Sequence, residues 1–296
     1  MDALGLLSLR YVRLSVPLTI LLLLIYFLSV QLPDVPLYGC NENGKHCNEK
    51  NKPVEKHPGI ENNQVNLEIK PEKTDHFFEH IRHCEGKDFQ ISRLVSAFES
   101  CVTVNNEILL KEYLSGWSEL VRFMNSLGTV FSFISYETTK KMKILRDYQS
   151  GPHAIEYHTL QSMVKYELKN HIVNFHEPPS DETPSGCRTL LRLHRALKWL
   201  ELFLFKLANS HDNEKTSDLC IDTYQYALAR YHNWFVRQAA VVAFLAMPEK
   251  RELFEIVCVK DKDEAKLVLT RTVHSLSKVY NITQKVYEKH RMLDLP

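Results

Sequence analysis

Glycine and proline are scarce in this chain, with 9 and 12 residues among 296. Because these two residues interrupt helices most strongly, long helices are possible over most of the sequence. The sequence also lacks a GxGxxG motif, a phosphate-binding loop and an internal repeat, which argues against dinucleotide binding, P-loop chemistry and solenoid folds. Lys and Arg (37) nearly balance Asp and Glu (36), so no net charge attracts nucleic acid.

No CxxC pair occurs among the seven cysteines, which argues against a structural zinc site. Their odd number and wide spacing predict mostly free thiols. Cys40 and Cys47 are the exception, since they follow an apolar segment where a disulfide and palmitoylation are both open. The stretch DHFFEHIRHC (75–84) has metal-ligand spacing, but a solvated helix face explains it as well, and it is not an HExxH motif. We expect no cofactor, no metal and no catalytic residue.

An uncharged run, LSVPLTILLLLIYFLSVQL (14–32), is long enough as a helix to span roughly 28 Å, close to a bilayer core. A cleaved signal peptide is the alternative, but no small-residue cleavage pattern follows. We therefore predict a single N-terminal membrane anchor or signal segment at 1–33 and a polar, flexible linker at 34–87. The side of the membrane stays open: Arg10 and Arg13 favour a luminal domain, lysines follow the run, and occupancy of the sequon Asn281-Ile-Thr would decide.

From Phe89 onward, apolar residues recur at helical spacing, and no run alternates long enough to predict a sheet. We expect helices at 88–102, 110–135 with a break at Gly128, 137–149, 157–173, 187–208, 219–232 and 233–247, followed by two more. The segments 187–208 and 236–247 are apolar nearly all round, which predicts burial on more than one side. Residues 88–296 are therefore expected to form an all-α, two-layer helical sandwich of about eight helices, with an apolar slot between the layers.

The segment GCRTLLRLHRALKWLELFLF (186–205) is unusual because it combines an apolar helix with arginines. Arg188, Arg192, Arg195 and Trp199 fall on one stripe, and leucines occupy the far side. Converging arginines suit a phosphate, because each guanidinium offers a planar fork of donors. From periodicity alone, a solvated face whose side-chain stems lie on the core is the simpler interpretation of the stripe.

Two further features carry the same ambiguity. Glu137 and Lys141 are an ordinary i, i+4 helix pair, or a carboxylate acceptor beside an ammonium donor. His232 is either a core histidine or a donor to a carbonyl. Taken together as ligand groups, these residues would bind a small head group with phosphate, amide and hydroxyl parts. The residues alone leave both interpretations open.

Three segments resemble the glycolipid transfer protein superfamily, and most closely its ceramide-1-phosphate transfer branch: EYLSGWSELVRFMNSLGTVFSFIS, SGCRTLLRLHRALKWLELFL and ALARYHNWFVRQAAVVAF. The C-terminal VYNITQKVYEKHRMLDLP is similar as well, so the resemblance covers residues 89–296. It implies an all-α, two-layer fold that holds one sphingolipid between its layers. It also implies transfer of that lipid between membranes without ATP and without breaking bonds.

The resemblance implies five head-group residues. An acid, here Glu137, would bind the sphingoid amide and hydroxyl region, and His232 would bind the acyl amide. The phosphate would be bound by Lys141, Arg188 and Arg192. The glycolipid branch has a sugar-stacking tryptophan where Arg188 stands, which favours phosphate over sugar. Glu137 departs from the family's Asp, and its extra methylene moves the carboxylate by about one C–C bond length, so selectivity or transfer is expected to change.

Five residues are the expected lining of the lipid-chain pocket by position and type, although plain core packing is an alternative for each: Phe123, Leu127, Phe131, Phe133 and Ile134. Trp234 resembles the family's membrane-docking tryptophan, and an indole suits the membrane interface. We expect a monomer whose partners are ceramide 1-phosphate or a related sphingolipid and membrane surfaces, with no nucleic acid. The alternative function is a membrane-tethered sphingolipid sensor or binding module without transfer activity.

Overall fold

The computed structural model describes residues 83–176 and 183–296. The chain divides into two compact units, 1–70 and 71–296, and every described residue belongs to the second unit. The predicted anchor, residues 1–33, lies outside the described residues, as does the linker up to residue 82. Cys40 and Cys47 lie there as well.

The predicted membrane-anchored localisation is overturned. No helix within 83–176 and 183–296 is long and apolar enough to cross a membrane. The two longest of these helices fail for a clear reason. One carries three arginines at 188, 192 and 195, and the other, at the C-terminal end, is amphipathic with charged residues along its length.

Helices make up the regular structure of the described residues, as the sequence predicts. In chain order they are α3 (Ile91–Ser100), α4 (Leu110–Ser126), η2 (Thr129–Phe131), α5 (Ser132–Ser150), α6 (Leu160–Lys169), α7 (Gly186–Asn209), α8 (Thr216–Ala227), η3 (Ala229–Tyr231), α9 (Trp234–Leu245), α10 (Lys250–Ile256) and α11 (Lys262–Lys289). Only two isolated β-bridges accompany them in these ranges. The predicted all-α class is confirmed.

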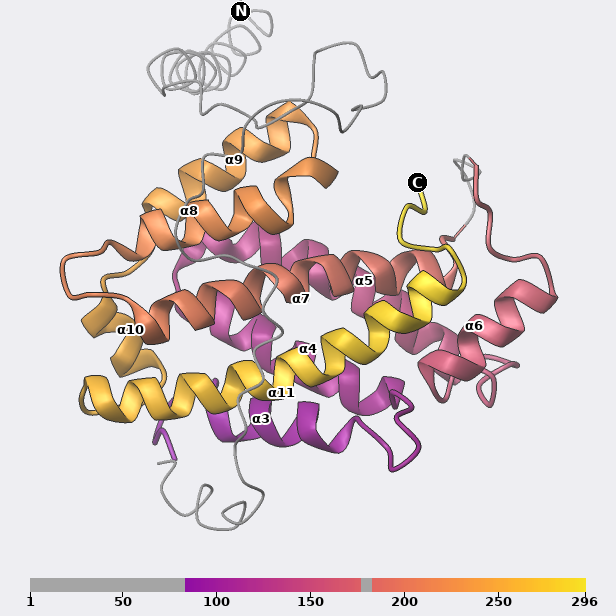
Figure 1. The fold of residues 1–296 in the computed structure, drawn as a ribbon, viewed down its shortest axis with the longest axis horizontal. Helices are drawn as coiled ribbons and strands as arrows, with labels where there is room; N and C mark the ends of the chain where they lie inside the picture. The colour runs from indigo at the N-terminus through magenta and orange to yellow at the C-terminus, as the bar shows by residue number, and fades with distance from the viewer. Residues whose placement is uncertain (1–82, 177–182) are drawn as a thin grey trace, which may run out of the picture. The chain divides into compact units, whose positions relative to one another are not determined.

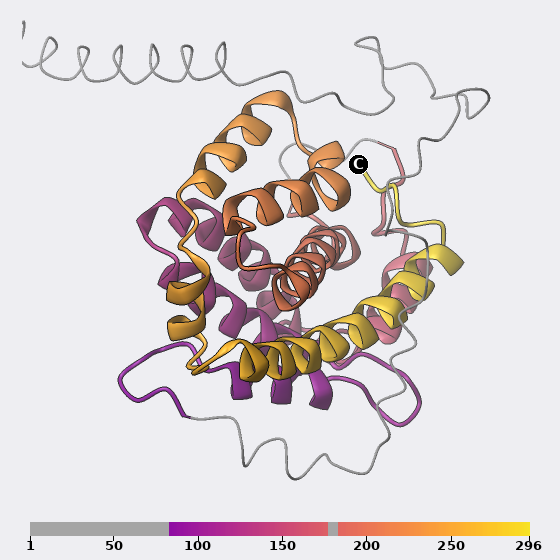
Figure 2. The same ribbon diagram turned by 60° about the vertical axis from the view of Figure 1, so that its left-hand side comes forward.

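The arginine-bearing helix α7 lies in the middle of the domain (Figures 1 and 2). It packs against α11, α8 and α5, with α11 and α3 below it and α8 and α9 above it in both views. Its leucines at 190, 191, 193, 197 and 200 are all buried. Burial on two sides is what an apolar helix of this length requires, so α7 is the predicted central member of the helical layers.

The break predicted at Gly128 is present, but the helix after it differs from the prediction. Gly128 adopts φ +110°, a conformation that residues with a Cβ rarely adopt, and α4 ends just before it. After the short η2 turn, α5 continues without interruption from Ser132 to Ser150. The sequence prediction divided this stretch near Tyr136, where no helix-breaking residue stands.

Helix α9 is less buried than its composition predicts. Only Ala240, Ala243 and Phe244 are buried, and they lie on the face that packs against α8. Most of its other large apolar residues are exposed: Trp234, Phe235, Val236, Val242 and Leu245. The prediction of burial on more than one side is therefore wrong for α9, because only the face with Ala240, Ala243 and Phe244 is buried.

The prediction of mostly free thiols needs one correction. Cys84 and Cys258 form a disulfide with a Cα–Cα distance of 5.8 Å across 174 residues of sequence, and Cys101, Cys187 and Cys220 are free and buried. Cys84, the last residue of the stretch with metal-ligand spacing, is therefore bonded to Cys258, and no cluster of metal-ligating side chains occurs among the residues described.

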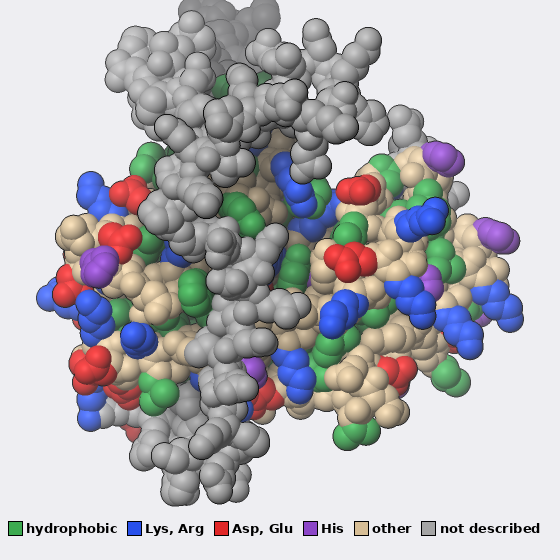
Figure 3. Space-filling view, viewed as in Figure 1, with side chains coloured by type: hydrophobic (Ala, Val, Ile, Leu, Met, Phe, Trp, Pro, Cys, Tyr) green, Lys and Arg blue, Asp and Glu red, His purple; other side chains and the backbone are tan. Residues whose placement is uncertain are grey.

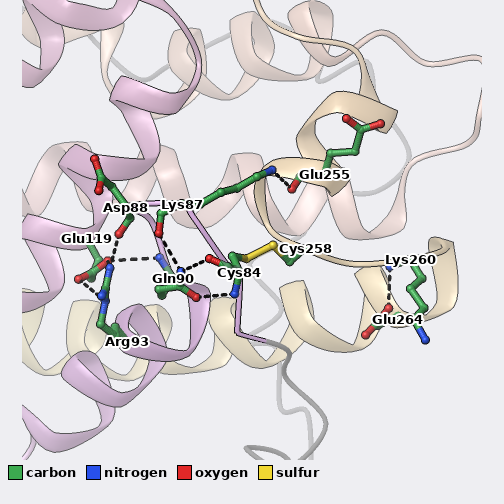
Figure 4. The surroundings of a disulfide bond; sticks show 10 residues. All are labelled: Cys84, Lys87, Asp88, Gln90, Arg93, Glu119, Glu255, Cys258, Lys260 and Glu264. Carbon is green, nitrogen blue, oxygen red and sulfur yellow. Dashed lines mark hydrogen bonds and ion pairs between the residues drawn. A yellow bond between two sulfur atoms is a disulfide. The ribbon is translucent and has the colours of Figure 1, made fainter.

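The disulfide joins the segment before α3 to the loop between α10 and α11 (Figure 4). The side-chain amide of Gln90 brackets Cys84: it accepts from the Cys84 amide (2.9 Å) and donates to the Cys84 carbonyl (2.8 Å). Lys87 donates to the carbonyl of Glu255 at the end of α10. The segment is therefore fixed on both sides of the disulfide.

Candidate functional site

The first part of the site lies on α5. The Lys141 ammonium is 3.4 Å from the Glu137 carboxylate and 3.2 Å from the Glu137 carbonyl, and Lys140 reaches the other carboxylate oxygen at 3.2 Å. Burial opposes ionisation of Glu137, but the hydrogen bond from Lys140 and the charge of Lys141 outweigh it and lower the pKa of the carboxyl. Glu137 is thus a charged acceptor held beside two ammonium groups.

The second part is the first two turns of α7. Side-chain acceptors bind the backbone amides at the N-terminus of this helix. The buried carboxylate of Glu167 on α6 accepts from the amides of Gly186 (2.6 Å) and Cys187 (3.0 Å). The Ser185 hydroxyl accepts from the Arg188 amide at 3.2 Å. These contacts satisfy the first amides of α7 and fix the direction in which Arg188 and Arg192 leave the helix.

The positive charge of Arg192 is disfavoured by its surroundings. Burial, and then the charges of Arg188 and Arg195, lower the pKa of Arg192 to about 10. Its guanidinium donates to the carbonyl of Arg188 (2.9 Å) and to a terminal oxygen of Pro296, and no Asp or Glu side chain within the described ranges forms an ion pair with it. An anion at this point would relieve the repulsion and gain a planar pair of donors.

Arg195 extends this cationic stripe and was not among the predicted head-group residues. It lies over the Tyr231 ring at 3.8 Å and donates to the Leu293 carbonyl at 2.6 Å. Burial lowers the pKa of Arg195 as well. The signal was present in the sequence, since Arg195 follows Arg192 by three residues on the same face of the helix.

His232, just after η3, connects the two parts. Its Nδ1 atom lies 2.8 Å from the Tyr224 hydroxyl on α8. Burial lowers the pKa of His232, and so do the charges of Lys141 on α5 and Arg195 on α7. The histidine therefore lies within electrostatic reach of both helices and is neutral at physiological pH. Among the cations of the two parts, Lys141 and Arg195 are the ones that act on His232.

The five predicted chain-pocket residues divide into two groups. Phe123, Leu127 and Phe131 are buried, and Ile134 is partly buried against the same core. Phe133 is instead 40% exposed and lies on the outside of α5. A cavity of about 140 Å³ lies between the end of α7 and helices α10 and α11, and none of the five lines it. The chain-pocket candidates are therefore packed against their neighbours in this conformation.

Trp234, the predicted docking residue, opens α9 with 45% of its surface exposed, and its neighbour Phe235 is 74% exposed. The two rings contact each other edge to face at 5.0 Å. Phe235 was missed because the sequence prediction placed this helix in the interior. Where Figure 3 shows the surface of the described residues, acidic and basic side chains are interspersed.

An all-α domain with a cationic cluster beside an apolar interior defines a class of protein suited to an amphiphile with an anionic head. The family described as Glycolipid transfer protein (GLTP) matches residues 108–259. The ceramide-1-phosphate transfer protein of Xenopus laevis is 46% identical over 209 residues, 70% of this chain and 97% of its own length. That of Homo sapiens is 43% identical over 208 residues, with 70% and 97% covered. The chain belongs to the glycolipid transfer protein family.

Solved structures agree with this assignment. The crystal structure of human ceramide-1-phosphate transfer protein in complex with 2:0 ceramide-1-phosphate has a TM-score of 0.68 and 43% identity, and covers 70% of this chain and 99% of its own. The mouse protein gives a TM-score of 0.67 at 44% identity, with 70% and 100% covered. The helical sandwich described above is therefore the glycolipid transfer protein fold.

Proposed function

We propose that this domain binds ceramide 1-phosphate, or a closely related phosphorylated sphingolipid, and moves it between membranes without breaking a bond. One observation carries the proposal: Arg188, Arg192 and Arg195 act on one another along α7, and no Asp or Glu side chain of the described residues forms an ion pair with Arg192. The ceramide-1-phosphate transfer proteins that the chain resembles support the choice of lipid.

In this proposal the phosphate is held by Lys141, Arg188 and Arg192. The two arginines offer planar forks and Lys141 a point charge, which together match the oxygens of a phosphate monoester. Arg195 adds positive potential without binding the phosphate directly, because its guanidinium already contacts the Tyr231 ring and the Leu293 carbonyl. Burial and then the charges of Arg188 and Arg195 lower the pKa of Arg192, and binding a dianion here counteracts both effects.

The amide region of the lipid is read by Glu137 and His232. Glu137 is an ionised acceptor, suited to an amide N–H and a hydroxyl. If the Tyr224 hydroxyl donates to Nδ1 of the neutral His232 ring, the proton of that ring is on Nε2 and is available to the acyl carbonyl. The lowered pKa of His232 keeps the ring in this neutral form.

The lipid chains enter the interior lined by Phe123, Leu127, Phe131 and Ile134, with Phe133 at the surface. Because these residues are packed together, chain entry has to separate them. Each methylene moved from water into the interior contributes about 0.8 kcal/mol, which offsets that cost. Trp234 and its exposed neighbours on α9 dock on the membrane from which the lipid leaves.

We further propose that residues 88–296 form this lipid-binding domain and act as a monomer. No cofactor and no catalytic residue are needed, because transfer changes the location of the lipid and not its covalent structure. Nucleic acid has no part in it. The relatives in the comparison are named as transfer proteins, which supports a non-enzymatic activity.

The proposal is tested by following fluorescent ceramide 1-phosphate between vesicles, with a neutral glycosphingolipid in parallel. We expect the full chain to transfer the phosphate lipid only, and Arg192→Leu to abolish this transfer. Arg251→Leu, an exposed arginine on α10, is the matched control and should transfer normally. Tight binding without transfer would instead indicate a binding module, and a folded chain that binds neither lipid would refute the proposal.

A further inference from the structure

A sequon, Asn281-Ile-Thr, stands on α11 and has no part in the proposed lipid site. Asn281 is exposed, while Val279, Thr283 and Tyr287 on the opposite face of the same helix are buried. Its side-chain amide makes no hydrogen bond to any described residue. We propose that Asn281 carries an N-linked glycan, added as the chain enters an oxidising secretory compartment.

Thr283 provides the first independent support. Its hydroxyl is buried and has no hydrogen-bond partner within the described ranges. Three other buried helical threonines, Thr189, Thr223 and Thr272, bond to the carbonyl four residues earlier at 2.8–2.9 Å. A buried hydroxyl without a partner destabilises a fold, and Val has nearly the same shape. The fold therefore makes no use of the hydroxyl that the sequon requires.

The Cys84–Cys258 disulfide provides the second independent support for glycosylation. Disulfides form and persist in oxidising compartments, and N-glycosylation occurs in the secretory pathway that provides one. Hydrogen bonds fix the backbone around this disulfide (Figure 4). The Gln90 side chain bonds to both backbone groups of Cys84, and Lys87 donates to the Glu255 carbonyl of α10. The free cysteines of the described ranges, Cys101, Cys187 and Cys220, are fully buried, so no thiol there is exposed to oxidation.

The chemistry needs one co-reactant, a polyprenyl-diphosphate oligosaccharide. The side-chain nitrogen of Asn281 attacks the anomeric carbon of the sugar, a C–N bond forms and the anomeric C–O bond to the diphosphate breaks. The polyprenyl diphosphate leaves, and the amide loses one proton to a base of the transferase. Because Thr283 is buried in the folded domain, this step precedes the folding of α11.

The glycan would leave the proposed docking surface free. Asn281 is on the solvent side of α11, and α11 and α9 lie on opposite sides of α7 in both ribbon views. A bulky, hydrated sugar on α11 therefore does not cover the exposed apolar face of α9. Lipid transfer is expected to be unchanged when the glycan is removed.

The test is expression of the full chain in cultured mammalian cells, followed by gel mobility before and after peptide N-glycosidase. We expect a mobility shift in the wild type and conversion of Asn281 to aspartate by the enzyme. Asn281→Gln and Thr283→Val should both lose the shift, and Thr283→Ser, which keeps the sequon, should retain it. Thr283→Val should also be at least as stable as the wild type, because it removes the unpartnered hydroxyl.

A wild-type chain that runs unshifted, with or without the enzyme, would overturn the inference, whatever the state of the Cys84–Cys258 disulfide. A shift that persists in both Asn281→Gln and Thr283→Val would overturn it as well, since the sugar would then be elsewhere. Misfolding of one variant does not decide the test, because the two variants change different side chains, one exposed and one buried.

Discussion

Single residues in the site combine burial with charge in a way that an ordinary surface does not. Arg192 has a pKa lowered to about 10 because it is partly buried between two other arginines, and His232 is kept neutral by burial and two nearby cations. Full exposure to water would weaken the electrostatic effects on both residues, so the lowered pKa values require the partly buried environment at this end of α7. An anionic ligand gains most at such a place, because it replaces a repulsion with charge-assisted hydrogen bonds.

A substitution at Glu137 tests whether this residue binds the amide region of the lipid. We expect Glu137→Gln to lower the transfer rate of ceramide 1-phosphate about tenfold or more, because a charge-assisted acceptor for the amide and hydroxyl is lost. Stability should change by less than about 0.5 kcal/mol, since the pair with Lys141 is exposed. Asp147→Asn is the matched control on the same helix, because Asp147 pairs with Lys143 at 2.6 Å in the same i, i+4 geometry. Equal losses in both variants would refute the role.

His194 makes the stability of the domain depend on pH. Burial between Tyr280 and Tyr287 lowers its pKa from 6.5 to about 4. The unfolded chain therefore binds the proton more readily, and the free energy of unfolding falls as pH falls from 6.5 to 4, by up to about 3 kcal/mol from this residue. Above pH 6.5 the residue has no such effect.

Urea unfolding at several pH values measures this dependence. His194→Gln should reduce the loss of stability between pH 6.5 and 4, whatever its effect at neutral pH. His176→Gln, at an exposed loop position, should leave the dependence as it is in the wild type. The assignment fails if His194→Gln retains the full dependence.

At the scale of elements, apolar spacing predicted the helices well and their environment less well. Helix α7 was correctly predicted as central, because leucines cover more than half of its circumference. Helix α9 is also largely apolar but has an exposed apolar face, since composition alone does not distinguish a face that meets protein from one that does not. The Cys84–Cys258 disulfide was also missed, because no local pattern relates residues 174 positions apart.

The exposed face of α9 predicts how the domain binds membranes. Phe235→Asp should weaken binding to vesicles about tenfold or more, because a Phe side chain contributes about 1.5–3 kcal/mol on leaving water. Stability should barely change, as the side chain is mostly in solvent. Ile155→Asp is the control, at a position that is 86% exposed and far in sequence from α9. Sedimentation with vesicles measures both, and equal weakening by the control would argue against a docking role for α9.

The disulfide predicts a large change in stability. Cys84→Ser should lower the free energy of unfolding by about 2–5 kcal/mol, because it opens a loop of 174 residues in the unfolded chain. Cys84→Ser with Cys258→Ser should cost no more than the single change, since both remove the same bond. Reductant should destabilise the wild type and leave the double variant unaffected. Additive losses would indicate that each cysteine matters through packing instead.

At the scale of the whole molecule, the arginines on a core helix follow from the position of α7. Helix α7 crosses the middle of the domain (Figures 1 and 2), and its arginines at 188, 192 and 195 are half-buried rather than fully exposed. The residues that would line a lipid are the same residues that pack the free domain. Lipid binding and domain stability are therefore coupled, since a ligand that separates the layers has to replace their contacts.

This coupling predicts a thermal shift that depends on phosphate. At one hundred times its dissociation constant, a short-chain ceramide 1-phosphate should stabilise the folded domain by about 2.7 kcal/mol, or roughly 5–10 °C in Tm for a domain of this size. Arg192→Leu should lose the shift and Arg251→Leu should keep it. The corresponding short-chain ceramide, without phosphate, should shift Tm much less. An equal shift from both lipids would mean that chain burial alone drives binding and that the arginine stripe only packs the domain.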